Sequence, residues 1–200
     1  MWRGTDSISG WVADAEFSQI ANPWGQGNVH KGFVASYSAA RAGMVALLHK
    51  ALAICPSCNV TISGHSLGAA LAVLTVADLG AQINGRGVRA LTFGGPRVGD
   101  AAFVSWMTSA RSSVAMERHT WEADLVPRLP PQSLLLVHYA HMPTEIWHHS
   151  KWKVCSTTDG EDSSCILSVP FFLLNWIDHG SYFGVSIFAG IPAGCLFDTH

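Results

Sequence analysis

Hydrophobic and polar residues alternate along the chain at the spacings of helices and strands. Apolar residues recur three and four positions apart over residues 36–53, in a segment rich in Ala and Leu, which predicts a helix. The short β-branched segment 59–63 predicts a strand. A second helical pattern follows over residues 69–83. The order is therefore helix, strand, sharp turn, helix.

The alternation continues toward the carboxyl end. Residues 88–93 and 114–121 read as strands and residues 101–110 as a short helix, whereas the Pro-rich segment 126–132 excludes regular structure. Between residues 144 and 168 the pattern is weak and predicts one strand, around residues 149–154, followed by a loop. Strands and helices that alternate in this way indicate an α/β fold with a mainly parallel sheet. At 200 residues, we expect a single domain over residues 1–200.

Charge and hydropathy narrow the possible partners. The formal net charge is -2 and no block of like charges occurs, so nothing in the chain is suited to neutralise the phosphates of a nucleic acid. The most apolar runs are too short to cross about 30 Å of hydrocarbon, so we expect no transmembrane segment. We also expect no cofactor and no metal.

Four of the five cysteines fall into two local pairs. Cys155 and Cys165 flank a turn-rich segment that a disulfide could close, and Cys55 and Cys58 form a C-x-x-C that is either a local disulfide or two inert thiols. A redox pair or half of a zinc site is the alternative for the C-x-x-C. No second C-x-x-C and no thioredoxin-like context supports it.

The sequon Asn59-Val60-Thr61 would accept an N-linked glycan in a secreted protein. It overlaps the start of a predicted strand, so a coincidental match remains the alternative.

The segment Gly64-His65-Ser66-Leu67-Gly68 is a G-x-S-x-G pattern between a predicted strand and a predicted helix. This is the position of a nucleophile elbow, in which a strained turn presents the serine hydroxyl above the sheet. A plain tight turn is the alternative. A serine nucleophile needs a histidine base and a carboxylate that orients the base, and on this fold both follow the serine in the chain.

Asp124 is the favoured acid, because it follows the predicted strand 114–121 and so lies at the edge of the sheet where α/β folds place their active sites. Glu122 and Asp100 remain alternatives. We expect the other downstream acids to point away from the site or into solvent; they are Asp78, Asp159, Glu161 and Asp162.

His179 is the favoured base among ten histidines, since it is late in the chain and the adjacent Gly180 permits a loop. The neighbouring Asp178 is not expected to orient it, because adjacent side chains in a turn diverge. His119 lies in a predicted strand and is interpreted as a structural histidine. The remaining cluster lacks the helical spacing of a metal-binding H-E-x-x-H motif; it comprises His138, His141, His148 and His149.

An ordered series of motifs resembles the class 3, or filamentous-fungal, lipases of the α/β-hydrolase superfamily. The motifs are "RGT", "VHKGF", "VTISGHSLGAALA", "GGPRVGD", "ADLVPRLPP" and "DHGSYFG". The resemblance implies an α/β-hydrolase fold with Ser66 as nucleophile, Asp124 as acid and His179 as base. It also implies an oxyanion hole formed by the backbone N–H of Leu67 and by Thr5. His65 matches a position that is not the base, and we interpret it as packing beside the elbow.

Members of that family carry a helical lid after the oxyanion residue. Here Ile8, Trp11 and Val12 would share one apolar face of a helical turn, which favours a lid that opens at a lipid surface. An ordinary core-facing turn is the alternative. Relatives that cleave feruloyl esters are more polar in this loop.

The family also has a helix and several strands ahead of the Arg-Gly-Thr motif, and we expect this chain to lack them. The resemblance implies that Cys195 has lost a cysteine partner near that end.

We therefore expect a secreted, monomeric serine esterase that releases fatty acids from acylglycerols at a lipid–water interface. The alternatives are a feruloyl or other small-ester esterase, a non-catalytic truncated product and, more remotely, a redox or metal protein built on the C-x-x-C.

Overall fold

The structure is a computed structural model that describes residues 17–83 and 87–186. Thr5, the expected lid residues Ile8, Trp11 and Val12, and Cys195 lie outside the described residues.

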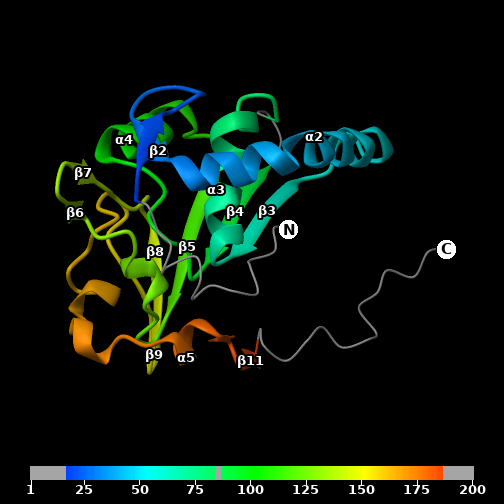
Figure 1. The fold of residues 1–200 in the computed structure, drawn as a ribbon. Helices are drawn as coiled ribbons and strands as arrows, with labels where there is room; N and C mark the ends of the chain where they lie inside the picture. Colours follow the sequence, from blue (N-terminus) through cyan, green and yellow to red (C-terminus); the bar gives the residue numbers. More distant parts are fainter. Residues whose placement is uncertain (1–16, 84–86, 187–200) are drawn as a thin grey trace.

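A five-stranded sheet forms the centre of the fold (Figure 1). Its strands lie in the order β3 (Val60–His65), β4 (Val88–Phe93), β5 (Ala115–Trp121), β8 (Glu145–His149) and β9 (Lys151–Val154). The first four strands are parallel, and only β9 runs antiparallel to its neighbour. The prediction of a mainly parallel sheet is therefore confirmed.

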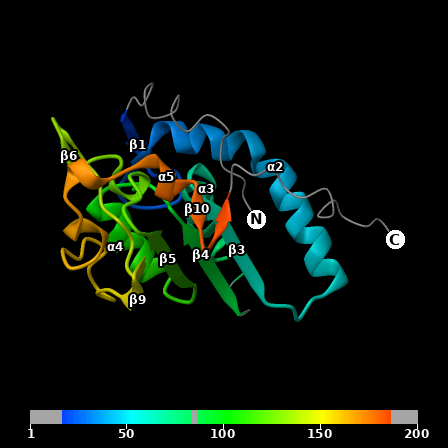
Figure 2. The same ribbon diagram turned by 90° about the horizontal axis from the view of Figure 1, so that it is seen from below.

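Two helices stack on one face of this sheet (Figures 1 and 2). Helix α3 (Leu67–Leu79) packs against β3 and β4, and α2 (Lys31–Ile54) packs against α3. Every residue of α3 is buried, which explains why its sequence is apolar on all sides rather than amphipathic. Helix α2 begins earlier than predicted because His30 accepts a hydrogen bond from the backbone N–H of Phe33 and so caps the helix.

Shorter elements complete the described chain. Helix α4 (Ala101–Ala110) matches its prediction and is capped by Asp100, which accepts a hydrogen bond from the N–H of Phe103. The remaining elements are β1 (Gln19–Ala21), β2 (Asn28–His30), η1 (Val126–Arg128), β6 (Ser133–Leu134), β7 (Val137–His138), η2 (Ile166–Ser168), η3 (Phe171–Leu173), α5 (Trp176–His179), β10 (Ser181–Tyr182) and β11 (Val185–Ser186).

Two sequence predictions about irregular segments were wrong. The single strand expected over residues 149–154 is a hairpin, with β8 and β9 joined at Ser150, whose φ is +50°. The start of β8 was missed because it carries Glu145, a buried acid that accepts a hydrogen bond from the Thr120 hydroxyl and so does not look like a strand residue. The Pro-rich segment 126–132, expected to be irregular, contains the 3-10 turn η1.

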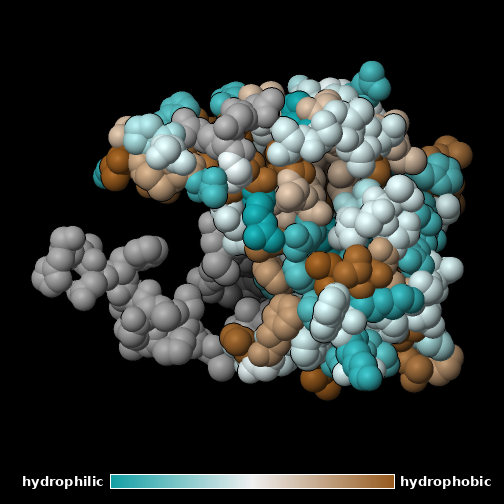
Figure 3. Space-filling model, turned by 180° about the vertical axis from the view of Figure 1, so that it is seen from behind, coloured by the Kyte–Doolittle hydropathy of each residue, from teal (hydrophilic) through white to brown (hydrophobic). Residues whose placement is uncertain are grey.

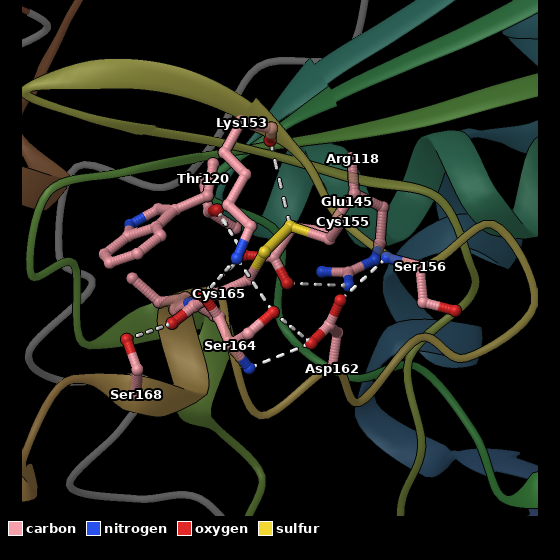
Figure 4. Close-up of a disulfide and its surroundings, with 12 residues drawn as sticks. Arg118, Thr120, Glu145, Lys153, Cys155, Ser156, Asp162, Ser164, Cys165 and Ser168 are labelled. Carbon is pink, nitrogen blue, oxygen red and sulfur yellow. Dashed lines mark hydrogen bonds and ion pairs between the residues drawn. A yellow bond between two sulfur atoms is a disulfide. The ribbon is translucent and has the colours of Figure 1, made fainter.

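Both local disulfides expected from the sequence are present. Cys55–Cys58 closes the turn after α2, and Cys155–Cys165 links the end of β9 to the start of η2 (Figure 4). Beside the second disulfide, the Lys153 ammonium donates to the carbonyl and hydroxyl of Ser164. The C-x-x-C is therefore a structural bridge in this fold.

The loop between Cys155 and Cys165 is less solvated than expected. Glu161 accepts two hydrogen bonds of 2.8 Å from the buried guanidinium of Arg97. Asp162 accepts hydrogen bonds from the backbone N–H groups of Ser156 and Ser164 and from the Ser164 hydroxyl, and these bonds lower its pKa to about 2. The expectation of solvent-exposed acids was wrong for Glu161, because a buried arginine elsewhere in the chain requires its charge.

Across the described ranges, no helix is both long enough and apolar enough to span a lipid bilayer.

Candidate active site

Ser66 occupies a strained turn between β3 and α3. Its φ of +59° and ψ of -128° lie in a region that residues with a side chain rarely adopt, at a cost of about 1–3 kcal/mol. Gly64 makes the turn possible, since a Cβ at this position would lie 2.0 Å from the carbonyl oxygen of Gly68. The G-x-S-x-G segment therefore has the geometry of a nucleophile elbow.

Asp124 and His179 form a buried pair at the same edge of the sheet. The Nδ1 atom of His179 lies 2.9 and 3.0 Å from the two carboxylate oxygens of Asp124, and both residues are fully buried. Asp124 also accepts a 2.8 Å hydrogen bond from the N–H of Val126 and a short one from the hydroxyl of Tyr182. The carboxylate is thus positioned to hold the Nδ1–H tautomer of His179, which leaves Nε2 as the basic atom.

The chain brings these residues together by joining the end of β5 to the segment before α5. Asn175 donates its N–H to the carbonyl of Ala123 and accepts a hydrogen bond from the N–H of Leu125 on its own carbonyl. Its side chain caps α5, the helix that ends in His179, by accepting a hydrogen bond from the N–H of Asp178. Asp124 and His179 are therefore fixed to each other through the backbone.

As expected, Asp178 is not the acid that orients His179. Its carboxylate accepts hydrogen bonds from the N–H of Ala123 and from the side chain of Asn175. Asp178, which is next to His179 in the sequence, thus stabilises the loop, whereas Asp124, 55 positions earlier, contacts the ring of His179.

The Oγ atom of Ser66 and the Nε2 atom of His179 are both buried and make no hydrogen bond within the described part of the chain. Unsatisfied buried polar atoms are costly, and in native structures they concentrate at sites of function. A nucleophile and a base that transfer a proton between them require these two atoms to be unoccupied by other partners.

His65 contacts His179 directly. Its ring centroid lies 4.5 Å from that of His179, and its Nε2–H donates a 3.1 Å hydrogen bond to the backbone carbonyl of His179. Burial, and then the proximity of His179, lower the pKa of His65 to about 3. It is therefore a neutral residue that packs beside the elbow, as expected, and it also bonds to the backbone of His179.

Two features of the site were not predicted from the sequence. Tyr182 donates to Asp124, and the only sequence signal for it is its place in the "DHGSYFG" motif. Gly94, with a φ of +54°, keeps the space beside this pair open, because a Cβ there would lie 2.8 Å from both Asp124 Oδ2 and the Tyr182 hydroxyl.

The two alternative acids bond to other partners: Asp100 caps α4, and Glu122 accepts a hydrogen bond from the ring of His149. Asp78, which was expected to point away from the site, binds Tyr37 and Arg41. Among the described residues, Asp124 is the acid that contacts His179.

The histidines His119, His138, His141 and His148 bond to partners other than Ser66. His119 bonds to His148, His138 to Ser133, and the buried His141 to the carbonyl of Pro127. In the described ranges, one group of potential metal ligands meets, at Cys155, Asp162 and Cys165, and its two sulfur atoms are already joined in a disulfide.

The arrangement defines a class of protein. A serine on a strand-to-helix elbow, followed in the chain by an acid after a later strand and then by a histidine, is the order found in the α/β-hydrolase fold. The chain belongs to the class 3 lipase family: the model of that family, "Lipase (class 3)", matches residues 1–134, and similar curated proteins carry the name lipase.

One such relative is a lipase from Rhizomucor miehei, which is 37% identical over 195 residues that cover 93% of this chain and 52% of the relative. Another is a secreted mono- and diacylglycerol lipase from Penicillium camembertii, 33% identical over 150 residues, covering 73% of this chain and 46% of the relative. The chain thus spans about half the length of the curated relatives it matches.

Solved structures show the same likeness. The propeptide complex of Rhizomucor miehei lipase matches with a TM-score of 0.80 and 36% identity over 92% of this chain and 60% of the other. A triacylglycerol lipase described as having a serine protease triad at its catalytic centre matches with a TM-score of 0.79 and 36% identity over 92% of this chain and 70% of the other.

Proposed function

We propose that this chain carries the catalytic machinery of a serine carboxylic-ester hydrolase that releases fatty acids from acylglycerols. The observation that carries the proposal is the buried His179–Asp124 pair at the same sheet edge as Ser66, whose hydroxyl is held on a positive-φ elbow. The similarity to triacylglycerol and to mono- and diacylglycerol lipases supports the substrate class.

In the proposed reaction, His179 removes the proton of Ser66 through Nε2, and the serine oxygen attacks the ester carbonyl to form an acyl-enzyme. Asp124 holds the ring and stabilises its protonated form. His179 then donates that proton to the departing alcohol. In the second half of the reaction it activates a water molecule, which releases the fatty acid and restores Ser66.

The oxyanion of the tetrahedral intermediate needs donors at the elbow. Leu67 is the first residue of α3, where backbone N–H groups have no partner inside the helix and the helix dipole favours negative charge. We assign the N–H of Leu67 to the oxyanion hole, with Thr5 as the second donor. Loss of one such donor costs about 10²- to 10³-fold in rate.

The proposal extends to the whole molecule. We infer one domain over residues 1–200, an apolar lid that includes Ile8, Trp11 and Val12, and action as a secreted monomer. Two disulfides fit an oxidising compartment. Asn59 is exposed just before β3 and is a candidate for N-glycosylation.

Substitution Ser66→Ala tests the mechanism. We expect hydrolysis to fall by at least about 10⁴-fold, because the nucleophile is removed while the elbow is kept. The measurement is fatty acid release from emulsified triacylglycerol and from a soluble short-chain ester. Ser36→Ala, on the exposed part of α2, is the matched control and should leave both rates unchanged. Full activity in a purified Ser66→Ala variant would contradict the proposal.

The same two substrates separate a lipase from a feruloyl or other small-ester esterase. A lipase of this kind should gain rate sharply once the ester exceeds its solubility and forms an interface. A rate that follows only the dissolved ester, with no increase at the interface, would favour the small-ester reaction and count against the lid.

A further inference from the structure

Two separate contacts hold the backbone around His179. The backbone of Asn175 ties the segment before His179 to the loop of Asp124. In the second contact, the Nε2–H of His65 donates a 3.1 Å hydrogen bond to the carbonyl of His179 itself. Because His65 directly precedes Ser66 in the chain, this bond connects the turn of His179 to the elbow.

The backbone of His65 is held by the central sheet. His65 is the last residue of β3 and pairs there with Phe93 of β4. The next N–H group, that of Ser66, donates a 3.0 Å hydrogen bond to the carbonyl of Phe93. Figure 2 shows α5 and β10 beside the ends of β3 and β4. The side chain of His65 therefore extends toward His179 from the part of the sheet that also holds the elbow.

The acceptor of the His65 hydrogen bond lies at the end of α5. The last carbonyl groups of a helix have no partner within the helix and need one elsewhere. Here the N–H of Gly180 bonds to the carbonyls of Trp176 and Ile177, and the side chain of His65 bonds to the carbonyl of His179. A side chain without a donor at position 65 would remove this restraint on the position of His179.

The hydrogen bond lies in a part of the molecule that is shielded from water. Seen from behind, hydrophilic residues are spread over the outer surface (Figure 3). His179, by contrast, has no exposed surface, and Ser66 is 1% exposed. A hydrogen bond is stronger in such surroundings than in water, and a buried carbonyl without a partner is costly. The bond is therefore suited to hold the backbone of His179 in one position.

The ring of His65 remains a neutral donor. A carbonyl oxygen can only accept, so the Nε2 atom of His65 carries the hydrogen. Burial, and then the proximity of His179, lower the pKa of His65 to about 3, so the ring stays uncharged near neutral pH. A neutral ring, 4.5 Å from the ring of His179, does not repel the positive charge that His179 acquires in the proposed reaction.

We propose that His65 is a positioning residue that sets the distance between the Oγ atom of Ser66 and the Nε2 atom of His179. This inference rests on the proposed function, since the two atoms exchange a proton in that reaction. Neither atom makes a hydrogen bond within the described ranges, so neither holds the other in place. A displacement of about 1 Å between reacting groups can cost about 100-fold in rate.

The test compares a variant that loses the donor with one that keeps a donor. His65→Leu has no side-chain N–H, and we expect its kcat on a soluble ester to fall by about 10- to 100-fold while KM changes by less than about twofold. His65→Gln carries an amide that can donate to the same carbonyl, and it should retain kcat to within about threefold.

The matched control is His148→Leu. It also removes a half-buried histidine from the central sheet, but the ring of His148 bonds to His119 rather than to His179. We expect kcat to change by less than about twofold in this variant.

A spectroscopic measurement separates positioning from a general loss of structure. The Nδ1–H proton of His179, which the Asp124 carboxylate accepts, should give a far-downfield NMR signal. We expect this signal to persist in His65→Leu, because the backbone of Asn175 still ties the two residues together. Thermal unfolding checks that each variant is folded. If His65→Leu does not fold, His65→Phe, which keeps a ring beside His179 without a donor, carries the same expectations.

Three results would overturn the proposal. The first is an unchanged kcat in His65→Leu, and the second is a fall in kcat as large in His65→Gln as in His65→Leu. The third is loss of the downfield signal in His65→Leu, which would show that His65 acts through the contact between Asp124 and His179.

Failure of the positioning role and failure of the proposed function give different results. Equal hydrolysis of the ester by the unmodified chain and by His65→Leu would reject the role of His65 alone. An unmodified chain that does not hydrolyse the ester would reject the proposed function, and the role of His65 with it.

Discussion

At the scale of single residues, burial and hydrogen bonding hold the Asp124 carboxylate against the ring of His179. The carboxylate has no exposed surface and receives hydrogen bonds from His179, from the N–H of Val126 and from the Tyr182 hydroxyl. Burial, and then the charge of Asp124, raise the pKa of Tyr182 well above its ordinary value. The Tyr182 hydroxyl therefore stays protonated and remains a donor to the acid throughout the working pH range.

We expect Tyr182→Phe to lower kcat by about three- to tenfold with little change in KM, since the acid loses a donor that fixes its orientation. The measurement is kcat and KM on a soluble ester.

Tyr139→Phe is the control for this substitution. It removes another buried phenol hydroxyl, one that donates to the backbone carbonyl of Phe17 rather than to the candidate site. Its kcat should match that of the unmodified chain. An equal fall in kcat in both variants would show that Tyr182 acts only through the stability of the fold.

Residues whose placement follows from a motif could be predicted, and contacts that depend only on three-dimensional proximity could not. Ser66 lies in a five-residue pattern, and Asp124 and His179 follow it in the order that the chemistry requires. Tyr182 and Glu161 each act on a partner far away in the sequence, Asp124 and Arg97 respectively. A lone tyrosine or glutamate carries no sign of such a partner, so neither contact could be read from spacing.

At the scale of secondary-structure elements, local patterns were again predictable and contacts between distant residues were not. Strand β4 and helix α4 have the bounds that the apolar pattern predicts, because their burial follows a simple period and Asp100 marks the start of the helix. The start of β8 was missed because its first residue, Glu145, is a buried acid that accepts a hydrogen bond from Thr120. Tertiary contacts there override the local pattern.

The two disulfides should differ in their contribution to stability. Cys155–Cys165 closes a sequence separation of 10 and Cys55–Cys58 one of 3. Because a longer loop loses more entropy when it is closed in the unfolded chain, we expect about 3 kcal/mol from the first and about 2 kcal/mol from the second. The measurement is the free energy of urea-induced unfolding for Cys155→Ser/Cys165→Ser and for Cys55→Ser/Cys58→Ser.

Each double variant is the control for the other, since both remove one bridge and leave the other in place. A larger loss from the Cys55–Cys58 pair would contradict the loop-length argument. It would indicate that the turn after α2, next to the start of β3, limits the stability of the fold.

At the scale of the whole molecule, buried charges join the disulfide loop to the loop that follows Asp124. The Arg97 side chain has 2% of its surface exposed, and its guanidinium binds both carboxylate oxygens of Glu161 at 2.8 Å. The same group donates to the carbonyls of Arg128 and Pro130. Arg97 thus links the segment before α4, the loop after Asp124 and the disulfide loop, which are distant in the sequence.

Substitutions of Arg97 and Glu161 should separate effects on the stability of the fold from effects on the rate of hydrolysis. Glu161→Gln leaves the Arg97 charge buried without its counter-ion, so we expect a loss of about 3–5 kcal/mol in the free energy of unfolding. Its effect on kcat should be small, because Arg97 still holds the carbonyls of Arg128 and Pro130. Arg97→Met removes those bonds as well and should lower both stability and kcat. Unfolding in urea and the rate on a soluble ester measure the two effects.

The double variant Arg97→Met/Glu161→Gln should lose less stability than the sum of the single variants, since neither charge is then left unpaired in the interior. Strict additivity would show that the two side chains do not stabilise each other. A fall in kcat as large in Glu161→Gln as in Arg97→Met would show that the ion pair itself, rather than the carbonyl contacts, sets the geometry of the Asp124 loop.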